Sequence, residues 1–332
     1  MRLVEAAVKS FARHETFHPR YGWFRKAYAF VEKDPGVFLR RDATVEIGVG
    51  KNMVRAIRFW GLAAKLIRED KRSRSRRVPN LIPTDLGHRL FGNAGWDRYM
   101  EDPGTLWLLH WMLLAPPSRL PVWWLAFHEF HAVEFTDDDL QAAINMQLDA
   151  AEWTKPHPSS IKKDVSALLR TYASPDHSKR KRTGIDDILD CPLRELNLIG
   201  RSATTEGYRF TLGEKPTLPS EILTYTALDY ISRTKTGGNT ITLSRLAREP
   251  GAPGRAFKLT EGEFLAGLEP AVARTDELDL VGTTAGSQLS WSEEPNQVAN
   301  KVLDAYYREP ADNCQIGMKG NKLMHPAVAR LP

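Results

Sequence analysis

Residues 45–67 read VEIGVGKNMVRAIRFWGLAAKLI, and this stretch decides how the rest of the sequence is interpreted. At about 100° per residue from Lys51, one side of a helix collects the apolar residues Met53, Ile57, Trp60, Ala64 and Ile67. The opposite side collects the basic residues Lys51, Arg55, Arg58 and Lys65, with Asn52 beside them at the exposed helix start. We therefore expect a helix over residues 51–67 with a packed back and a basic front, as a DNA recognition helix requires. An ordinary solvated helix face is the alternative interpretation.

The residues on either side of this helix predict a winged helix-turn-helix. Residues 21–32 form an expected helix that the Asp34-Pro35-Gly36 turn ends, and a short apolar strand is expected before a short helix opened by Thr84. A basic loop with the sequence KRSRSRR precedes this strand, and its basic residues are Lys71, Arg72, Arg74, Arg76 and Arg77. No carboxylate interrupts this run, so we expect it to contact DNA phosphates and to make binding strongly dependent on salt.

Similar patterns follow in the middle of the chain and near its end. Residues 159–172 predict a helix with Lys163 and Arg170 opposite its apolar side, residues 191–199 a second helix, and residues 207–213 a strand. A second basic run consists of Lys179, Arg180, Lys181 and Arg182. Near the end, helices are expected over 219–231, 242–249 and 296–307, together with a helix opened by the Thr260–Glu263 capping box and a hairpin over 278–291. The predicted fold class is mainly α with small β wings, arranged as tandem winged helix-turn-helix-like units.

Composition suggests where these units divide. Eight of the nine tryptophans lie at or before Trp153, and proline-containing joints follow at residues 155–160 and 213–221. We expect a Trp-rich winged-helix domain with a helical extension at 1–153, a second winged-helix-like unit at 154–215 and a third at 216–332. The third unit is acidic in places, which favours protein contacts over phosphate contacts.

The overall composition excludes several classes of protein. The 332 residues include 46 Lys and Arg against 41 Asp and Glu, which gives a net charge of +5. Two cysteines are too few for a disulfide framework or a cysteine-based zinc site. Prolines divide the apolar stretch 106–127 into two core helices, so no membrane span is expected, and the first residues do not resemble a secretory signal. A cytoplasmic location follows. GVGKN, residues 48–52, lacks the spacing of a phosphate-binding loop, so neither a nucleotide nor an organic cofactor is expected.

Catalytic candidates are weak. His14, Glu15 and His18 match H-E-x-x-H, but Pro19 follows at once and argues against an uninterrupted metal-binding helix. These residues are better explained as bracing the start of the next helix, and His128 and His131 as buried or boundary histidines. The tightest carboxylate group is Asp97, Glu101 and Asp102, and Tyr21 lies near the first polar cluster. Such acids could support a nuclease with Mg²⁺ or Mn²⁺, or could cap helices.

HETFHPRYGWFRKAY, VEIGVGKNMVRAIRFWGLAAKL, WDRYMEDPGTLWLLHWMLL and SSIKKDVSALLRTY together resemble a bacterial family known as a domain of unknown function, over roughly residues 10–310. Within that family the chain is most similar to the SspB-type component of DNA phosphorothioation systems, which place sulfur in the DNA backbone for antiphage defence. The resemblance implies a protein that binds and nicks DNA beside a cysteine desulfurase, an ATP-pyrophosphatase-like enzyme and an ATPase. It assigns no catalytic residue here. A non-enzymatic winged-helix regulator or assembly adaptor is the alternative.

Overall fold

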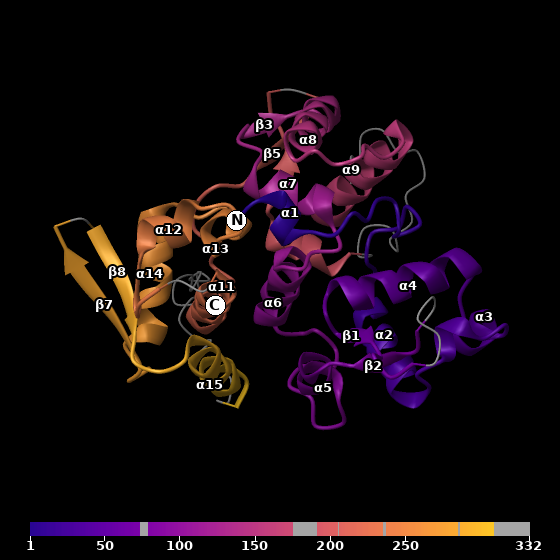
Figure 1. Ribbon diagram of the computed structural model, residues 1–332, viewed down its shortest axis with the longest axis horizontal. Coiled ribbons are helices and arrows are strands. Elements are labelled where there is room, and N and C mark those ends of the chain that lie inside the picture. Colours follow the sequence, from indigo (N-terminus) through magenta and orange to yellow (C-terminus); the bar gives the residue numbers. More distant parts are fainter. Residues whose placement is uncertain (74–78, 175–190, 205, 235–236, 285, 309–332) are drawn as a thin grey trace, which may run out of the picture.

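The computed structural model describes residues 1–73, 79–174, 191–204, 206–234, 237–284 and 286–308, and these are mainly helical. Their strands form small antiparallel sheets, one of two strands and two of three. The central helix α6 (Pro103–Leu114) contacts α11 (Ser220–Thr234) and α13 (Pro253–Phe257) of the C-terminal region and η2 (Pro192–Leu196) of the middle region (Figure 1). The expectation of a mainly α protein with small β elements is confirmed, whereas the winged-helix assignment remains a prediction.

The N-terminal region has the expected order of helices, hairpin and helix. Its elements are α1 (Leu3–Ala6), α2 (Trp23–Lys33), η1 (Val37–Leu39), α3 (Ala43–Ile47), α4 (Lys51–Ala63), β1 (Ile67–Glu69), β2 (Leu81–Pro83) and α5 (Asp85–Phe91). β1 and β2 pair antiparallel, with Arg68 opposite Ile82. As expected, Thr84 opens α5, because its side chain accepts a hydrogen bond from the Gly87 amide at 3.1 Å.

The predicted extent of the central basic helix is wrong at its C-terminal end. α4 ends at Ala63, Lys65 has a positive φ of 58°, and Ile67 already begins β1. Lys65 turns inward, and its Nζ donates to the carbonyl oxygens of Met112 and, at 2.7 Å, of Ala115. Its side chain therefore closes the C-terminal end of α6 and is not part of the basic front of α4.

The apolar stretch 106–127 forms the two expected core helices. α6 is followed by α7 (Pro121–His128), with a cis peptide bond between Pro116 and Pro117 in the connection. Both helices are apolar on all sides and buried, and Trp107, Trp111, Trp123 and Trp124 are at most 1% exposed. Within the described ranges, no helix combines the length and the apolar character that crossing a lipid bilayer would require.

The middle region contains β3 (Glu134–Phe135), α8 (Asp137–Ala150), α9 (Pro158–Tyr172), η2 (Pro192–Leu196), β4 (Ile199–Arg201) and β5 (Tyr208–Phe210). The helix predicted over 191–199 is wrong. A five-residue 3-10 helix, η2, ends at Asn197 in the left-handed conformation, and β4 follows. β3 pairs with β5, so this sheet contains strands from both sides of the predicted boundary at residue 153.

The C-terminal region contains α11 (Ser220–Thr234), β6 (Thr240–Thr242), α12 (Leu243–Arg248), α13 (Pro253–Phe257), α14 (Glu261–Val272), β7 (Leu278–Thr283), β8 (Gly286–Trp291) and α15 (Pro295–Arg308). The predicted capping box is confirmed at Thr260 and Glu263, and the predicted hairpin is β7–β8. α15 packs on α11 and also reaches the N-terminal half of the chain, where Tyr307 stacks on Trp96 with ring centroids 4.6 Å apart.

Candidate nucleic-acid interface

The start of α4 presents polar and cationic side chains to solvent. Lys51 and Asn52 are exposed, and the Arg55 side chain is 53% exposed. The opposite side of the helix is buried and includes Val54, Ala56, Ile57, Phe59 and Trp60. The indole Nε1 of Trp60 donates to the Phe17 carbonyl oxygen at 3.1 Å, which fixes the rotation of the helix against the loop before α2. The buried side of α4 therefore fixes the orientation of its exposed basic side.

The residues predicted for this basic front differ in their exposure to solvent and in their ion pairs. Arg55 lies 3.5 Å from Glu15, a long contact in which the arginine stays half exposed. Arg58 is only partly exposed, and burial lowers the pKa of its guanidinium, as does neighbouring Arg119, while Glu69 opposes that shift. Arg58 therefore lies at the edge of the front, toward β1. Together with the inward turn of Lys65, this confines the exposed front to Lys51, Asn52 and Arg55.

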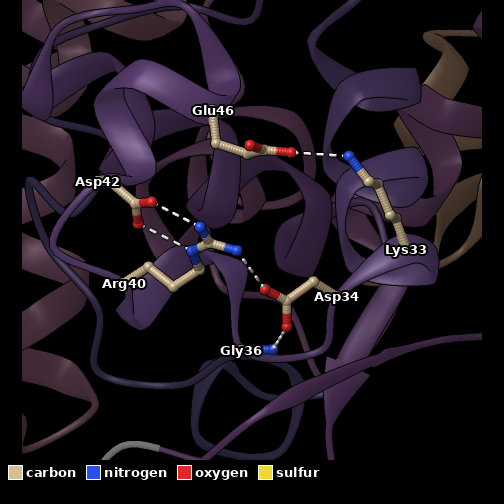
Figure 2. Close-up of polar contacts among 6 residues, drawn as sticks. All are labelled: Lys33, Asp34, Gly36, Arg40, Asp42 and Glu46. Atoms are coloured by element: carbon tan, nitrogen blue, oxygen red, sulfur yellow. Dashed lines mark hydrogen bonds and ion pairs between the residues drawn. The ribbon is translucent and has the colours of Figure 1, made fainter.

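The segment that leads into α4 uses its charges differently. Arg40 donates to both carboxylate oxygens of Asp42, at 2.8 and 2.5 Å, and to Asp34 at 3.3 Å (Figure 2). Lys33 pairs with Glu46 at 2.8 Å, and Asp34 also accepts the Gly36 amide (Figure 2). Lys33 and Arg40 are therefore neutralised by carboxylates of the same segment.

The loop at residues 10–20 contacts both the basic helix α4 and α9. The carboxylate of Asp164 on α9 accepts the Ala12 amide at 2.9 Å and contacts His14 Nε2 at 2.6 Å. His14 and Asp164 are both buried, and the imidazole is stacked against Trp60 with centroids 6.2 Å apart. This pair is enclosed in the core and anchors the loop, which lies between α4 and α9 (Figure 1).

Of the basic residues predicted on α9, Arg170 contacts this loop directly. Lys163 and Arg170 are exposed, and Arg170 donates to the Thr16 carbonyl oxygen at 2.6 Å. Burial lowers the pKa of His18 to about 3, and the positive charges of Arg194, Arg170 and Arg20 lower it further in that order of size. The loop therefore gathers arginines from three segments around a neutral histidine.

The two basic runs are only partly within the described residues. Lys71 and Arg72 are exposed, with Arg72 Nε 3.7 Å from an Asp70 oxygen. The other members, Arg74, Arg76, Arg77, Lys179, Arg180, Lys181 and Arg182, lie outside the described residues. Their predicted role in binding stays a prediction.

The carboxylate candidates have structural partners. Asp97 is buried and accepts the Glu101 and Asp102 amides at 2.9 and 3.1 Å. Asp102 caps α6 through the Gly104 amide and also accepts the Tyr306 hydroxyl, both at 2.7 Å. Glu101 is exposed. These contacts fit the capping interpretation, and nothing in them assigns a catalytic role.

A divalent metal held entirely by protein ligands does not fit the described residues. Among them, no three His, Cys, Asp or Glu groups come close enough together to hold an ion. The H-E-x-x-H residues are not helical, since Glu15 and Thr16 both have positive φ, and His14 is committed to Asp164. His128 is buried in α7 while His131 is exposed beyond it.

Three residues of this region were not predicted from the sequence. Asp164 interrupts the apolar side of α9, three residues after Ile161 and four before Leu168, and that interruption signalled a buried acid with a partner. Arg194 and Glu195 lie on η2, and nothing in the local sequence indicates that they reach the loop at residues 10–20.

The fold and the basic surface define a mainly helical protein with a candidate polyanion-binding face formed by α4, α9 and the loop between them. Residues 11–307 match the model of a family described as protein of unknown function, DUF4007, and the chain belongs to that family. It is 42% identical to a solved structure, the SspB crystal structure, over 92% of this chain and 90% of that one, with a TM-score of 0.85. A magnesium-ion-bound SspB crystal structure gives the same identity, coverage and TM-score. No protein with a curated description matches.

Proposed function

We propose that this protein is a DNA-binding component of a bacterial DNA phosphorothioation system and that it nicks DNA. The observation that carries the proposal is the exposed start of α4, where Lys51, Asn52 and Arg55 project from a helix whose other side is fixed in the core. Membership of the family and the similarity to SspB support the assignment to that system.

In this proposal α4 is the recognition helix of a winged-helix unit and enters a groove of the duplex. The connection between β1 and β2 is the wing, and its residues 71–77 hold the phosphate backbone. Lys163, Arg170 and residues 179–182 extend the contact along the DNA. Charge provides most of the affinity, whereas contacts from Asn52 and Arg55 to base edges provide sequence preference.

Nicking is proposed with Mg²⁺ or Mn²⁺ present, and a magnesium ion is bound in one SspB structure. Magnesium is usually held by one or two carboxylates, water and substrate phosphates, so DNA itself would supply part of the site. A cysteine desulfurase, an ATP-pyrophosphatase-like enzyme and an ATPase are the proposed partners, because a nick gives sulfur-insertion enzymes access to the backbone.

The experiment combines DNA binding with plasmid nicking. Purified protein is incubated with supercoiled plasmid and Mg²⁺ or Mn²⁺, while binding to a linear duplex is measured at several salt concentrations. We expect open-circular plasmid and a steep fall of affinity with salt. Failure to bind at low salt would refute the proposal as a whole.

A second function is a non-enzymatic DNA-binding adaptor for the same system. It is favoured by one observation: the described residues hold no group of three or more metal-ligating side chains, and Asp97 and Asp102 accept hydrogen bonds from backbone amides. Plasmid that stays supercoiled although the protein binds it would identify this function.

A further inference from the structure

Tyr21 lies where the loop at residues 10–20 meets η2. Its hydroxyl donates to Oε1 of Glu195, which is 174 residues away in the sequence, and its side chain remains 41% exposed. The residue precedes α2 by two positions, so its backbone is fixed by the start of a helix that packs on α4. Tyr21 is thus a surface tyrosine held by a carboxylate.

Other tyrosines of the chain show what a purely structural pair looks like. Tyr28 donates to Glu32 and Tyr230 donates to Glu249, but both rings are about 1% exposed and lie in the core. Such hydroxyls need a partner because they are buried. The Tyr21 ring, by contrast, is 41% exposed, so solvent and ligands can reach the surface beside the Tyr21–Glu195 hydrogen bond.

Arginines gather beside this pair. Arg194 adjoins Glu195 on η2, and its Nε donates to the Arg170 carbonyl oxygen at 3.0 Å. Arg170 in turn donates to Thr16, and the charges of Arg194, Arg170 and Arg20 all act on His18, three residues before Tyr21. The exposed front of α4 adjoins the same loop through the Arg55–Glu15 contact. A phosphodiester bound by these arginines would lie on the surface that also carries Tyr21, whose own electrostatic neighbours include Glu195, Cys191 and Asp97.

The Tyr21 hydroxyl keeps its proton in the resting protein. Burial raises the pKa of Tyr21, and the hydrogen bond to Glu195 and the charge of Glu195 raise it further. The hydroxyl is therefore neutral at physiological pH and needs a base during attack. Glu195 is that base, because it already accepts the proton-bearing hydroxyl.

We propose that Tyr21 is the nucleophile that opens the DNA strand, with Glu195 as the proton acceptor; this inference rests on the proposed nicking function. The Tyr21 oxygen forms a bond to phosphorus, the bond from phosphorus to one deoxyribose oxygen breaks, and the phosphate stays on the tyrosine as an ester. The tyrosine proton passes to Glu195 and then to the departing deoxyribose oxygen. The step consumes neither water nor an oxidant, and the arginines stabilise charge on the phosphate oxygens.

Covalent trapping on DNA tests this inference. The probes are duplexes that carry a pre-existing nick at successive positions of one strand, so that cleavage close to a nick releases a short strand piece that diffuses away and the ester cannot reverse. Each end of the cleaved strand carries a different fluorophore, and the reaction is stopped in detergent. We expect one label to migrate with the protein on a denaturing gel, and peptide mass spectrometry to place the adduct on Tyr21.

Variants identify the residue roles. Tyr21→Phe should abolish the adduct and reduce nicking on the order of 1,000-fold or more. Glu195→Gln should slow adduct formation about 100-fold while leaving DNA affinity unchanged. Tyr99→Phe is the matched control, because Tyr99 is 60% exposed and stacks under Arg25 without a carboxylate partner among the described contacts, and it should behave as wild type. Thermal unfolding of each variant verifies that it folds.

The outcomes separate this inference from the proposed function. If wild-type protein nicks plasmid but forms no adduct, or if Tyr21→Phe nicks at the wild-type rate, the inference is overturned and the nicking function survives. If the trapping duplexes are bound but yield no adduct and plasmid stays supercoiled, both the inference and the nicking function are refuted.

Discussion

The N-terminal and C-terminal regions have similar elements, but the start of α4 in the N-terminal region uses its charges differently from the C-terminal region. Both combine short helices with a small antiparallel sheet. In the C-terminal region the cations are matched to carboxylates: Arg245 to Glu249 at 2.7 Å, Arg248 to Glu261 at 3.1 Å, and Lys301 to Glu293 at 3.0 Å. On α4 Lys51 and Arg55 are exposed, and the contact of Arg55 with Glu15 is 3.5 Å long.

This difference distinguishes charges that pair within the protein from charges that remain available to bind a polyanion. Exposed ion pairs contribute little to stability, but they cancel the local field that would attract a polyanion. An exposed cationic front keeps its field, and several such cations release counterions when they meet phosphates. The comparison therefore favours the N-terminal region as the place of the proposed DNA contact and the C-terminal region as a place of internal contacts. Each of the following changes tests one half of that expectation.

The largest expected effect is on stability, from Asp229→Ala. Asp229 on α11 accepts both Trp111 Nε1 of the central helix and Arg233 Nε, each at 2.8 Å, and is 8% exposed. Its removal leaves a buried indole N–H and a guanidinium without their acceptor, so unfolding free energy should fall by about 3 kcal/mol. Urea unfolding measures this loss.

Asp279→Ala, at an exposed position on β7, is the control and should change stability by less than about 0.5 kcal/mol. Loss of DNA affinity in folded Asp229→Ala would contradict the division of roles.

The second prediction concerns the stability of the fold at low pH, which depends on His110. Burial lowers the pKa of this imidazole to about 4, and it is hydrogen-bonded to the Tyr172 hydroxyl at 2.8 Å and the Ala256 carbonyl oxygen at 3.0 Å. Because the carbonyl can only accept, Nε2 carries the proton and Nδ1 accepts from Tyr172.

The folded pKa lies below the unfolded value near 6.5, so the unfolded chain binds the proton first. Stability from this group is therefore complete above about pH 6.5 and is lost as the pH falls toward about 4, by up to about 3 kcal/mol. Urea unfolding across this range should show a shallower decline for His110→Gln than for wild type. Parallel curves would mean that His110 is not the group responsible.

Much of the fold was predictable because its signals are local. Thr84 and the Thr260–Glu263 box mark helix starts through bonds within one turn, and the prolines of residues 116–121 end α6 before α7. The errors are non-local. Lys65 fits the helical period but turns inward because the end of α6 offers it carbonyl oxygens. The helix predicted over 191–199 failed because Asn197 and the pairing of β4 with β5 override local propensity.

The candidate site was predictable only in part for the same reason. A period of 3.6 residues identifies the front of α4, and Lys51, Asn52 and Arg55 are indeed exposed. The meeting of Tyr21 with Glu195, and of His14 with Asp164, joins residues 150 or more positions apart. No local pattern encodes such contacts, because they form only when α9 and η2 pack against the loop at residues 10–20.

The smallest expected free-energy change is in DNA binding, from Lys51→Ala combined with Arg55→Ala. Both side chains are exposed, so removing them should leave stability nearly unchanged. Affinity for duplex DNA at low salt should fall by about 2 kcal/mol, roughly 30-fold, because each lost phosphate or base contact is worth about 1–3 kcal/mol. The slope of log affinity against log salt should also become shallower, by about one unit for each phosphate contact removed. Fluorescence anisotropy over a salt series measures both quantities.

Arg245→Ala combined with Arg248→Ala is the matched control in the C-terminal region. It removes the same formal charge from α12, but those guanidinium groups are already paired with Glu249 and Glu261. Removing the two arginines exposes two carboxylates and lowers the net charge as much as the α4 variant does. If net charge is not the cause of binding, the affinity for DNA should nevertheless change by less than about 0.5 kcal/mol. Equal losses from the two double variants would show that DNA responds to the total charge of the protein. A loss confined to the α4 variant would locate binding on the exposed front of that helix.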